Sequence, residues 1–124
     1  MPDSPHVTEA EWKIMKLLWR KSPQPAYDLA LALEDSEGWS QRTVKTLLGR
    51  LLKKGVLRHE PYKNLYLYSP AVTEEECVQA ESESFLEQVF DNSVGSLMLH
   101  FARHRKLSKE EAAELRKILK EQGK

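Results

Sequence analysis

Basic and hydroxyl side chains gather on one side of residues 40–54, whose sequence SQRTVKTLLGRLLKK has the spacing of an amphipathic helix. At 100° per residue the apolar side chains fall within an arc of about 140°; they are Val44, Leu47, Leu48, Leu51 and Leu52. The opposite side contains no acid and consists of Arg42, Lys45, Thr46, Gly49, Arg50 and Lys53. Arginine and lysine bind phosphates or guanine edges, and threonine contacts phosphate or a thymine methyl group. This side therefore predicts a DNA-binding face.

The lack of acidic residues on this face is informative. Helices kept for stability mix charges, because opposite charges four residues apart stabilise them. The whole chain has a net charge of zero, yet residues 39–63 carry seven basic residues and one acid, Glu60. A polyanionic partner would relieve this repulsion, and local charge decides what a surface attracts. From charge alone, a solvated basic surface remains the alternative.

A second set of residues with possible chemistry lies near the C-terminus. His100 and His104 have the four-residue spacing of helical metal ligands. The residues between them are Phe-Ala-Arg, without the glutamate of a metalloprotease, and the chain has no Gly-rich phosphate loop or Ser/His/Asp motif. We therefore predict that the protein is not an enzyme and has no cofactor or metal site. The two histidines are then interpreted as partly exposed residues of the C-terminal region. A metal-responsive regulator that uses His100 and His104 is the alternative, which zinc titration would distinguish.

Cysteine content and hydropathy indicate the compartment. A single cysteine, Cys77, cannot form an intrachain disulfide or a Cys-rich metal site, and it suits a reducing cytoplasm. The first residues, MPDSPHVTEAEW, lack the basic and apolar segments of a signal peptide. Because no apolar run approaches the ~20 residues of a membrane helix, we expect a cytoplasmic protein without membrane insertion.

The elements around the basic helix predict a winged helix-turn-helix domain over residues 1–70. A Thr8/Glu11 capping box begins a first helix, and a second helix runs from Pro25 or Ala26 to Leu33. Its expected core residues are Tyr27, Leu29, Ala30 and Leu33. Ser40 and Gly55 bound the third helix, and runs 56–59 and 65–69 flank the turn EPYKN. Three helices and a hairpin, in this order, are typical of that fold.

Residues 71–124 contain helical stretches without a strand signal. Together with the three helices and the hairpin of residues 1–70, they predict a mainly α (α+β) fold class. Large apolar residues are poorly buried in so small a unit, and a second copy would cover them. We predict a three-helix dimerisation domain and a homodimer. Its expected interface residues are Phe85, Val89, Phe90, Leu97, Leu99, Phe101, Leu115, Ile118 and Leu119. An apolar core within one subunit is the alternative.

The predicted partner of the first domain is double-stranded DNA, bound by the third helix and the hairpin. The predicted DNA-binding residues are Ser40, Gln41, Arg42, Thr43, Lys45, Thr46, Arg50, Lys53, Arg58 and Lys63. Tyr66 and Tyr68 are interpreted as packing residues of the hairpin. A winged-helix protein–protein adaptor is the alternative, but a protein groove would more often meet an apolar face.

Four blocks of sequence, in order, resemble the penicillinase-repressor family of BlaI/MecI/CopY-type regulators. They are TEAEWKIMKLLW, SQRTVKTLLGRLLKKGVL, NLYLYSP and SLMLHFARHRKLSKEEAAELRKIL, and the similarity extends from about Val7 to Leu119. The resemblance implies a homodimeric winged-helix repressor on palindromic operators of β-lactam-resistance or other stress genes. It further implies inactivation by a signal-activated membrane metalloprotease.

Two departures from the family pattern narrow this expectation. Copper-responsive members carry a C-terminal cysteine cluster, which a chain with only Cys77 lacks. The β-lactam repressors have Asn-Phe at their cleavage point, where this chain has His100-Phe101. The resemblance thus implies His100-Phe101 as the cleavage position, with histidine in place of asparagine.

Overall fold

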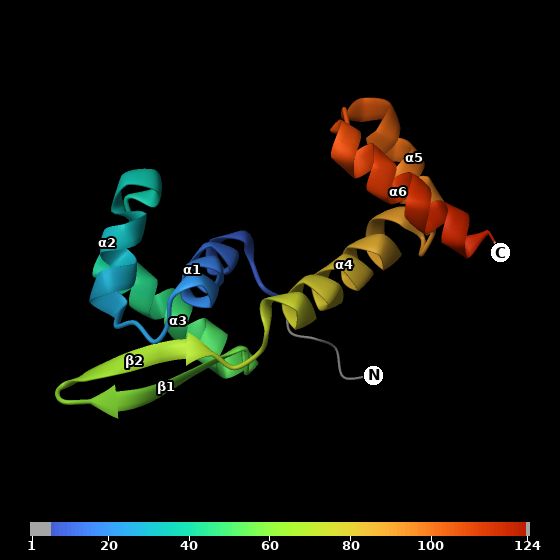
Figure 1. Ribbon diagram of the computed structural model, residues 1–124. Coiled ribbons are helices and arrows are strands. Elements are labelled where there is room, and N and C mark those ends of the chain that lie inside the picture. Colours follow the sequence, from blue (N-terminus) through green and yellow to red (C-terminus); the bar gives the residue numbers. More distant parts are fainter. Residues whose placement is uncertain (1–5, 124) are drawn as a thin grey trace. The chain divides into compact units, whose positions relative to one another are not determined.

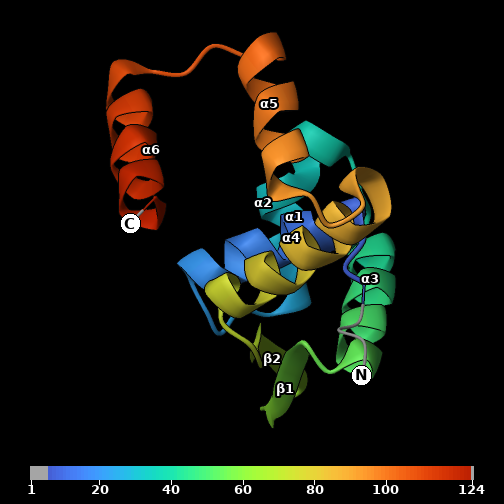
Figure 2. The same cartoon turned by 90° about the vertical axis from the view of Figure 1, so that its right-hand side faces the viewer.

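The computed structural model describes residues 6–123, which divide into two compact units, unit 1 up to Ser82 and unit 2 from Glu83. Figures 1 and 2 show the elements of each unit. The first five residues, on which the expected lack of a signal peptide partly rests, lie outside the described part. The fold class is confirmed: the chain is mostly helical, with one small antiparallel sheet.

Unit 1 begins with three helices, and their ends follow local sequence signals. Helix α1 spans Glu9–Arg20 and α2 spans Ala26–Glu37. Helix α3 spans Gln41–Lys54. The Thr8/Glu11 capping box is present at the start of α1. Gly38 and Gly55 end α2 and α3 with φ of 68° and 81°, values that glycine adopts without steric cost.

The hairpin that follows is longer than its sequence indicated. Strand β1 spans Leu57–Tyr62 and β2 spans Leu65–Pro70, so Lys63 and Asn64 alone form the turn. Pro61 is accommodated within β1 because the sheet has two strands and both are edges. Gln24, between α1 and α2, exchanges two backbone hydrogen bonds with Tyr68 of β2, of 3.0 and 2.9 Å. This bridge fixes the hairpin to the helices.

The core of unit 1 lies between the helices and the base of the hairpin. Its fully buried apolar side chains are Val7, Ile14, Met15, Leu18, Leu29, Val44, Leu48 and Leu51. Leu29 and Leu33 are buried as predicted, and Ala30 is half-buried against the core. Tyr27 is 58% exposed, so its assignment to the core was wrong. It lies on the solvent side of the first turn of α2, where the helical period places Ala26, Leu29 and Leu33 inward.

Unit 1 continues past Pro70 into the fourth helix. Helix α4 spans Glu74–Phe90, and Thr73 and Glu76 form the predicted capping contacts at its start. The indole of Trp19 donates a hydrogen bond of 3.0 Å to the Val72 carbonyl. Cys77 is buried in the same core, and burial, followed by the charge of Glu81, raises the pKa of its thiol. The first turns of α4 are therefore part of the packed unit, and the functional boundary at Pro70 stays a prediction.

Unit 2 consists of the rest of α4, α5 (Val94–His104) and α6 (Lys109–Gln122). Ser93 and Ser108 cap the last two helices, the second with a full capping box to Glu111. An extended connection of four residues joins α5 to α6 (Figure 2). Neither α5 nor α6 has a buried residue. Unit 2 thus has regular helices but no closed core of its own.

Candidate nucleic-acid interface

Helix α3 is held by its two ends and its apolar face. The Ser40 hydroxyl accepts a hydrogen bond of 3.1 Å from the Thr43 amide, which satisfies one free N–H of the first turn. The side chains of Val44, Leu47, Leu48 and Leu51 are buried against the other helices and β1. The opposite face of α3 is thereby fixed toward solvent.

The exposed face of α3 holds the basic side chains that the sequence placed there. Every predicted DNA-binding residue of this helix is exposed: Gln41, Arg42, Thr43, Lys45, Thr46, Arg50 and Lys53. Ser40, at the N-cap, is exposed as well. Gln41, Arg42, Lys45 and Thr46 line an open hollow of about 550 Å³. The face is a basic surface without a carboxylate, and its side chains serve no part of the core.

Two details of this face refine its chemistry. The Thr46 hydroxyl donates to the Arg42 carbonyl at 3.1 Å, so its methyl group is the part left for an apolar contact. Gly49 has open space around it, since an added Cβ would meet no atom within 4 Å. No packing contact within the described chain therefore requires a glycine at this position.

The hairpin carries the remaining predicted residues. Arg58 and Lys63 are exposed, and Lys63 adopts a φ of 57° in the turn with its ammonium 5.3 Å from the Tyr62 ring centre. On the other face His59 stacks on Tyr66 with ring centres 4.6 Å apart. Tyr68 is half-buried against the core, and burial followed by the charge of Tyr66 raises its pKa.

A buried ion pair holds the end of α3, and the sequence analysis missed it. Lys54 binds the Glu11 carboxylate and also donates to the His6 carbonyl at 2.6 Å. Glu11 is fully buried in α1. Burial raises the pKa of Glu11, but hydrogen bonds from Lys54 and Thr8 and the charge of Lys54 outweigh it, so the net pKa is lowered. The capping box explained Glu11 locally, and nothing in the sequence pointed to a partner 43 residues away.

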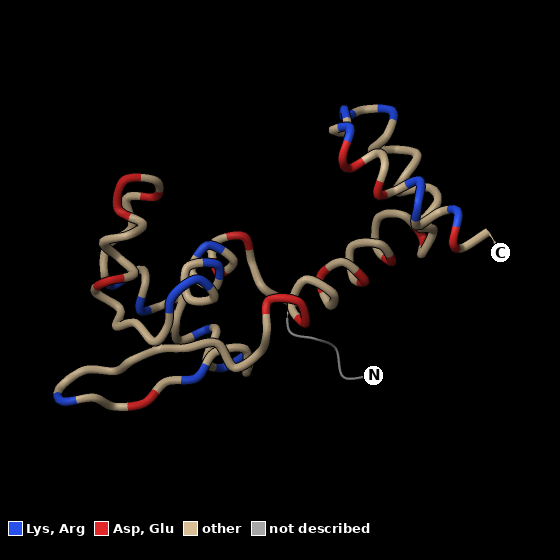
Figure 3. Tube along the Cα trace, viewed as in Figure 1, with Lys and Arg blue, Asp and Glu red and all other residues tan. Residues whose placement is uncertain are grey.

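The charges of the molecule are segregated along the chain (Figure 3). Basic residues concentrate on α1, α3 and the hairpin, whereas α4 carries only acids. The predicted interface residues of unit 2 are all exposed or half-buried in the single chain. The exposed fractions of Phe85, Val89, Leu99, Phe101, Ile118 and Leu119 range from 42% to 57%.

His100 and His104 stand side by side on α5, with ring centres 4.5 Å apart. The Nδ1 atom of His104 lies 2.8 Å from the His100 carbonyl, and Phe90 and Phe101 flank the His100 ring. Within residues 6–123, no three His, Cys, Asp or Glu side chains come together as a metal site. No helix in the same range is long and apolar enough to cross a membrane.

The helix order, the bridged hairpin and the exposed basic α3 define a winged-helix DNA-binding regulator. Solved structures agree: the DNA-binding domain of the repressor BlaI is 32% identical, with a TM-score of 0.54 over 61% of this chain and 93% of that domain. Escherichia coli MarR shares the fold at 21% identity, with a TM-score of 0.51 over 93% of this chain and 74% of that one.

Residues 7–121 match the penicillinase repressor family, and the chain belongs to it. It is 33% identical to the penicillinase repressor of Bacillus licheniformis over 98% of this chain and 94% of that protein. The methicillin resistance regulatory protein MecI of Staphylococcus aureus is 31% identical over 91% and 92% of the two chains. The chain is thus a transcriptional repressor by family, which the sequence blocks had predicted.

Proposed function

We propose that the protein is a homodimeric repressor that binds palindromic operator DNA through α3 and the hairpin. The acid-free exposed face of α3 is the observation that carries this proposal. A relative supports the proposal: the monomeric form of B. licheniformis BlaI, 32% identical, was solved in complex with the blaP half-operator. Phosphate contacts from Arg50, Lys53, Arg58 and Lys63 set the register, while the first turns of α3 reach base edges.

The test is the triple variant Arg42→Ala/Lys45→Ala/Thr46→Ala. Each lost bidentate base contact costs ~1–3 kcal/mol, so specific binding should disappear from a gel-shift assay while the circular dichroism spectrum stays unchanged. The control is Arg20→Ala/Lys21→Ala. It removes two exposed basic side chains outside α3, at the last residue of α1 and at its C-cap position. Wild-type affinity of the triple variant would refute this assignment.

The dimer is proposed to form through unit 2. Eight large apolar residues of unit 2 are exposed in the single chain and need a cover, and a second copy supplies an identical apolar surface. Two linked domains make the second half-site contact intramolecular, on half-sites spaced by ~10 base pairs or a multiple. Sedimentation of the full chain at micromolar concentration should give a dimer, and a monomer would exclude this assembly.

Derepression is proposed to follow cleavage at His100-Phe101 by a membrane sensor metalloprotease, and the regulated genes are proposed to be β-lactam-resistance or other stress genes. Both residues are exposed in the middle of α5. A cut there detaches α6 with Leu115, Ile118 and Leu119, and each 1.4 kcal/mol of lost burial weakens the dimer about tenfold. Mass spectrometry of the repressor from induced cells should show residues 1–100. An intact chain during full derepression would rule out this mechanism.

A further inference from the structure

Opposite charges occupy two separate segments of the C-terminal region, and neither segment contains its own counter-charge. From residue 64 to residue 102 the chain has no Lys or Arg and seven acids: Glu74, Glu75, Glu76, Glu81, Glu83, Glu87 and Asp91. Residues 103–109, with the sequence RHRKLSK, then hold four basic residues and no acid. In Figure 3 the charged positions of α4 are all red, and blue positions gather at the connection between α5 and α6. Such blocks repel themselves unless a partner of opposite sign faces them.

The acids at the start of α4 already have functions within unit 1. Glu74 lies 3.6 Å from Lys16, Glu81 lies 3.3 Å from His6, and the Glu76 carboxylate accepts a hydrogen bond of 2.8 Å from the Thr73 amide. The acids farther along α4 lie in unit 2, where Glu83, Glu87 and Asp91 are exposed. Glu83 and Glu87 are four residues apart on one face of α4, which also carries the half-buried Phe90 of the proposed dimer interface, whereas Phe85 and Val89 lie on the opposite face.

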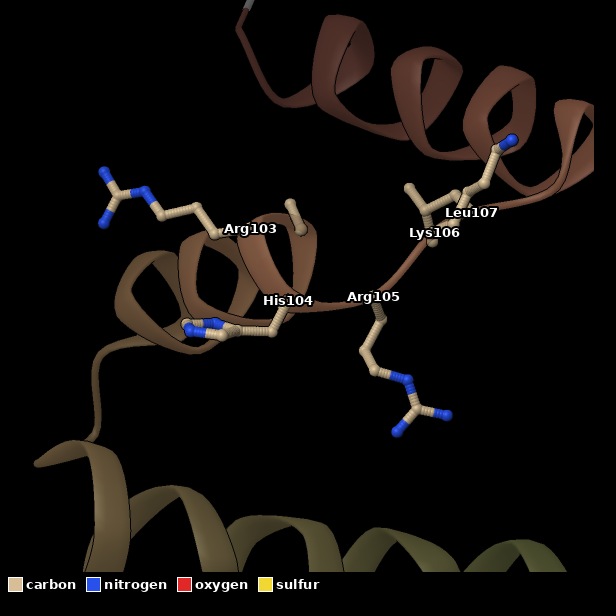
Figure 4. Close-up of a pocket in the computed structure, with 6 residues that line it drawn as sticks. Arg103, His104, Arg105, Lys106 and Leu107 are labelled. Atoms are coloured by element: carbon tan, nitrogen blue, oxygen red, sulfur yellow. The ribbon is translucent and has the colours of Figure 1, made fainter.

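The basic segment is unpaired in the single chain. Arg103, Arg105, Lys106 and Lys109 are exposed, and within residues 6–123 none of them forms an ion pair. Residues 102–107 line an open hollow of about 500 Å³ (Figure 4). The side chains of Arg103 and Arg105 point in different directions there, which does not suit one small anion. An extended surface of opposite charge fits this arrangement better.

We propose that the α5–α6 connection of one subunit, through Arg103, Arg105 and Lys106, docks on the acidic Glu83/Glu87 face of α4 of a second copy of this chain. The inference rests on the proposed dimer. Charge complementarity carries it, because Glu83, Glu87 and the basic residues of 103–109 lie in the same unit as the exposed apolar residues. Phe101 and Leu107, both 42% exposed, flank the basic residues, so the charged contact continues the apolar one. By two-fold symmetry the contact occurs twice.

The proposed ion pairs determine which chain is bound, and in which arrangement, more than they increase the affinity of the dimer. Exposed ion pairs contribute little each, whereas like charges that face one another are strongly disfavoured. A subunit presents both blocks, so two copies are complementary only when the acidic face of each meets the basic connection of the other. Apolar burial then supplies affinity, and the charges select the arrangement and the partner chain.

A charge-swap experiment on the full chain tests the proposal. The variant Arg103→Glu/Arg105→Glu places like charges at both contacts, as does the variant Glu83→Lys/Glu87→Lys. Each should dimerise about 10- to 100-fold more weakly than the wild type, because every substitution counts twice. An equimolar mixture of the two should form a heterodimer of near wild-type stability, detected by native mass spectrometry. The control Arg116→Glu/Lys117→Glu makes the same change of charge on the exposed side of α6 and should dimerise like the wild type.

The outcomes separate the possible partners. Weak homodimers that the mixture restores would support the contact between copies. Weak variants without restoration on mixing would overturn it, since a contact within one chain is not repaired in trans. Variants that dimerise normally but bind operator DNA less tightly and with a lower salt slope would assign the basic segment to phosphates and also overturn it. A wild-type chain that is monomeric would remove the proposed dimer itself.

Discussion

Units 1 and 2 are both mainly helical, yet only one of them buries its apolar side chains. Unit 1 has eight apolar residues with 1% exposure or less around α1, α2 and α3. In unit 2, α5 and α6 have none, although both helices are well capped. Local helix signals are thus equally good in the two units, and the difference lies in what the apolar faces meet. Unit 1 has a buried apolar core of its own, whereas the apolar faces of α5 and α6 stay exposed or half-buried in the single chain.

The largest expected change in stability comes from a substitution in the core of unit 1, and it tests the difference in burial between the two units. Leu48→Ala should lower the free energy of unfolding by about 3–4 kcal/mol, because Leu48 is fully buried and a cavity remains. Leu99→Ala, a matched change at a residue 56% exposed, should leave the unfolding of unit 1 unaltered and weaken only the dimer. Urea titration with sedimentation measures both. Equal losses of stability would contradict the division into two units.

Lys54→Ala is the next largest expected effect. It leaves the buried Glu11 carboxylate without its cation, and breaking a buried ion pair costs about 3 kcal/mol. The end of α3 should loosen, so operator affinity should fall although Lys54 lies off the exposed basic face. Lys53→Ala, one residue earlier and exposed, is the control for stability and should change it by less than about 0.5 kcal/mol. Urea titration compares the two, and equal stability would show that the buried pair contributes nothing.

The same ion pair gives unit 1 an acid dependence. The folded-state pKa of Glu11 lies below its ordinary value of 4.5, so the unfolded chain takes up the proton more readily than the folded one. This contribution to stability is present above pH 4.5 and is lost as the pH falls through the folded-state pKa. Thermal unfolding between about pH 6 and pH 3 should show the decline, and Lys54→Ala should show a shallower one. Identical slopes would exclude Glu11 as a cause.

Truncation of the chain tests whether the N-terminal domain ends at Ser82, as the compact unit does, or at Pro70, as the sequence predicted. A chain ending at Ser82 keeps the Trp19–Val72 hydrogen bond and the burial of Cys77, whereas a chain ending at Pro70 loses both. The shorter fragment should be less stable by about 2 kcal/mol, from roughly one hydrogen bond and one small buried side chain. Both should be monomers. Equal stability would place the boundary at Pro70.

Gly49→Ala is the smallest change and acts in two directions. Alanine favours a helix interior by about 1 kcal/mol over glycine, and the added Cβ meets nothing in the free protein. The variant should therefore be slightly more stable but bind operator DNA about tenfold more weakly if α3 lies close against the DNA backbone. Thermal unfolding and gel shift give the two values. Higher stability with unchanged binding would show that the space at Gly49 is not used.

Sequence reasoning was most successful where a feature is local. Ser40, Gly55 and the Thr8/Glu11 box bound helices at the expected places, because caps act within four residues. It failed where distant segments decide. The Glu11–Lys54 pair joins residues 43 apart. The hairpin extends to Tyr62 because β1 is an edge strand, in which Pro61 is tolerated. Tyr27 shows that a large apolar residue in a helix start is not necessarily buried.

The hydrogen bond from Trp19 to Val72 has an optical consequence. All three tryptophans (Trp12, Trp19 and Trp39) and all four tyrosines belong to unit 1, whereas unit 2 contains neither residue type. Fluorescence excited at the indole band therefore observes the winged helix alone and is blind to α5 and α6. The Trp19 indole also contacts the segment between β2 and α4, so its emission should register a change at that joint. Tryptophan emission should thus change when unit 1 unfolds, whereas loss of the proposed contacts of α5 and α6 should leave it largely unchanged.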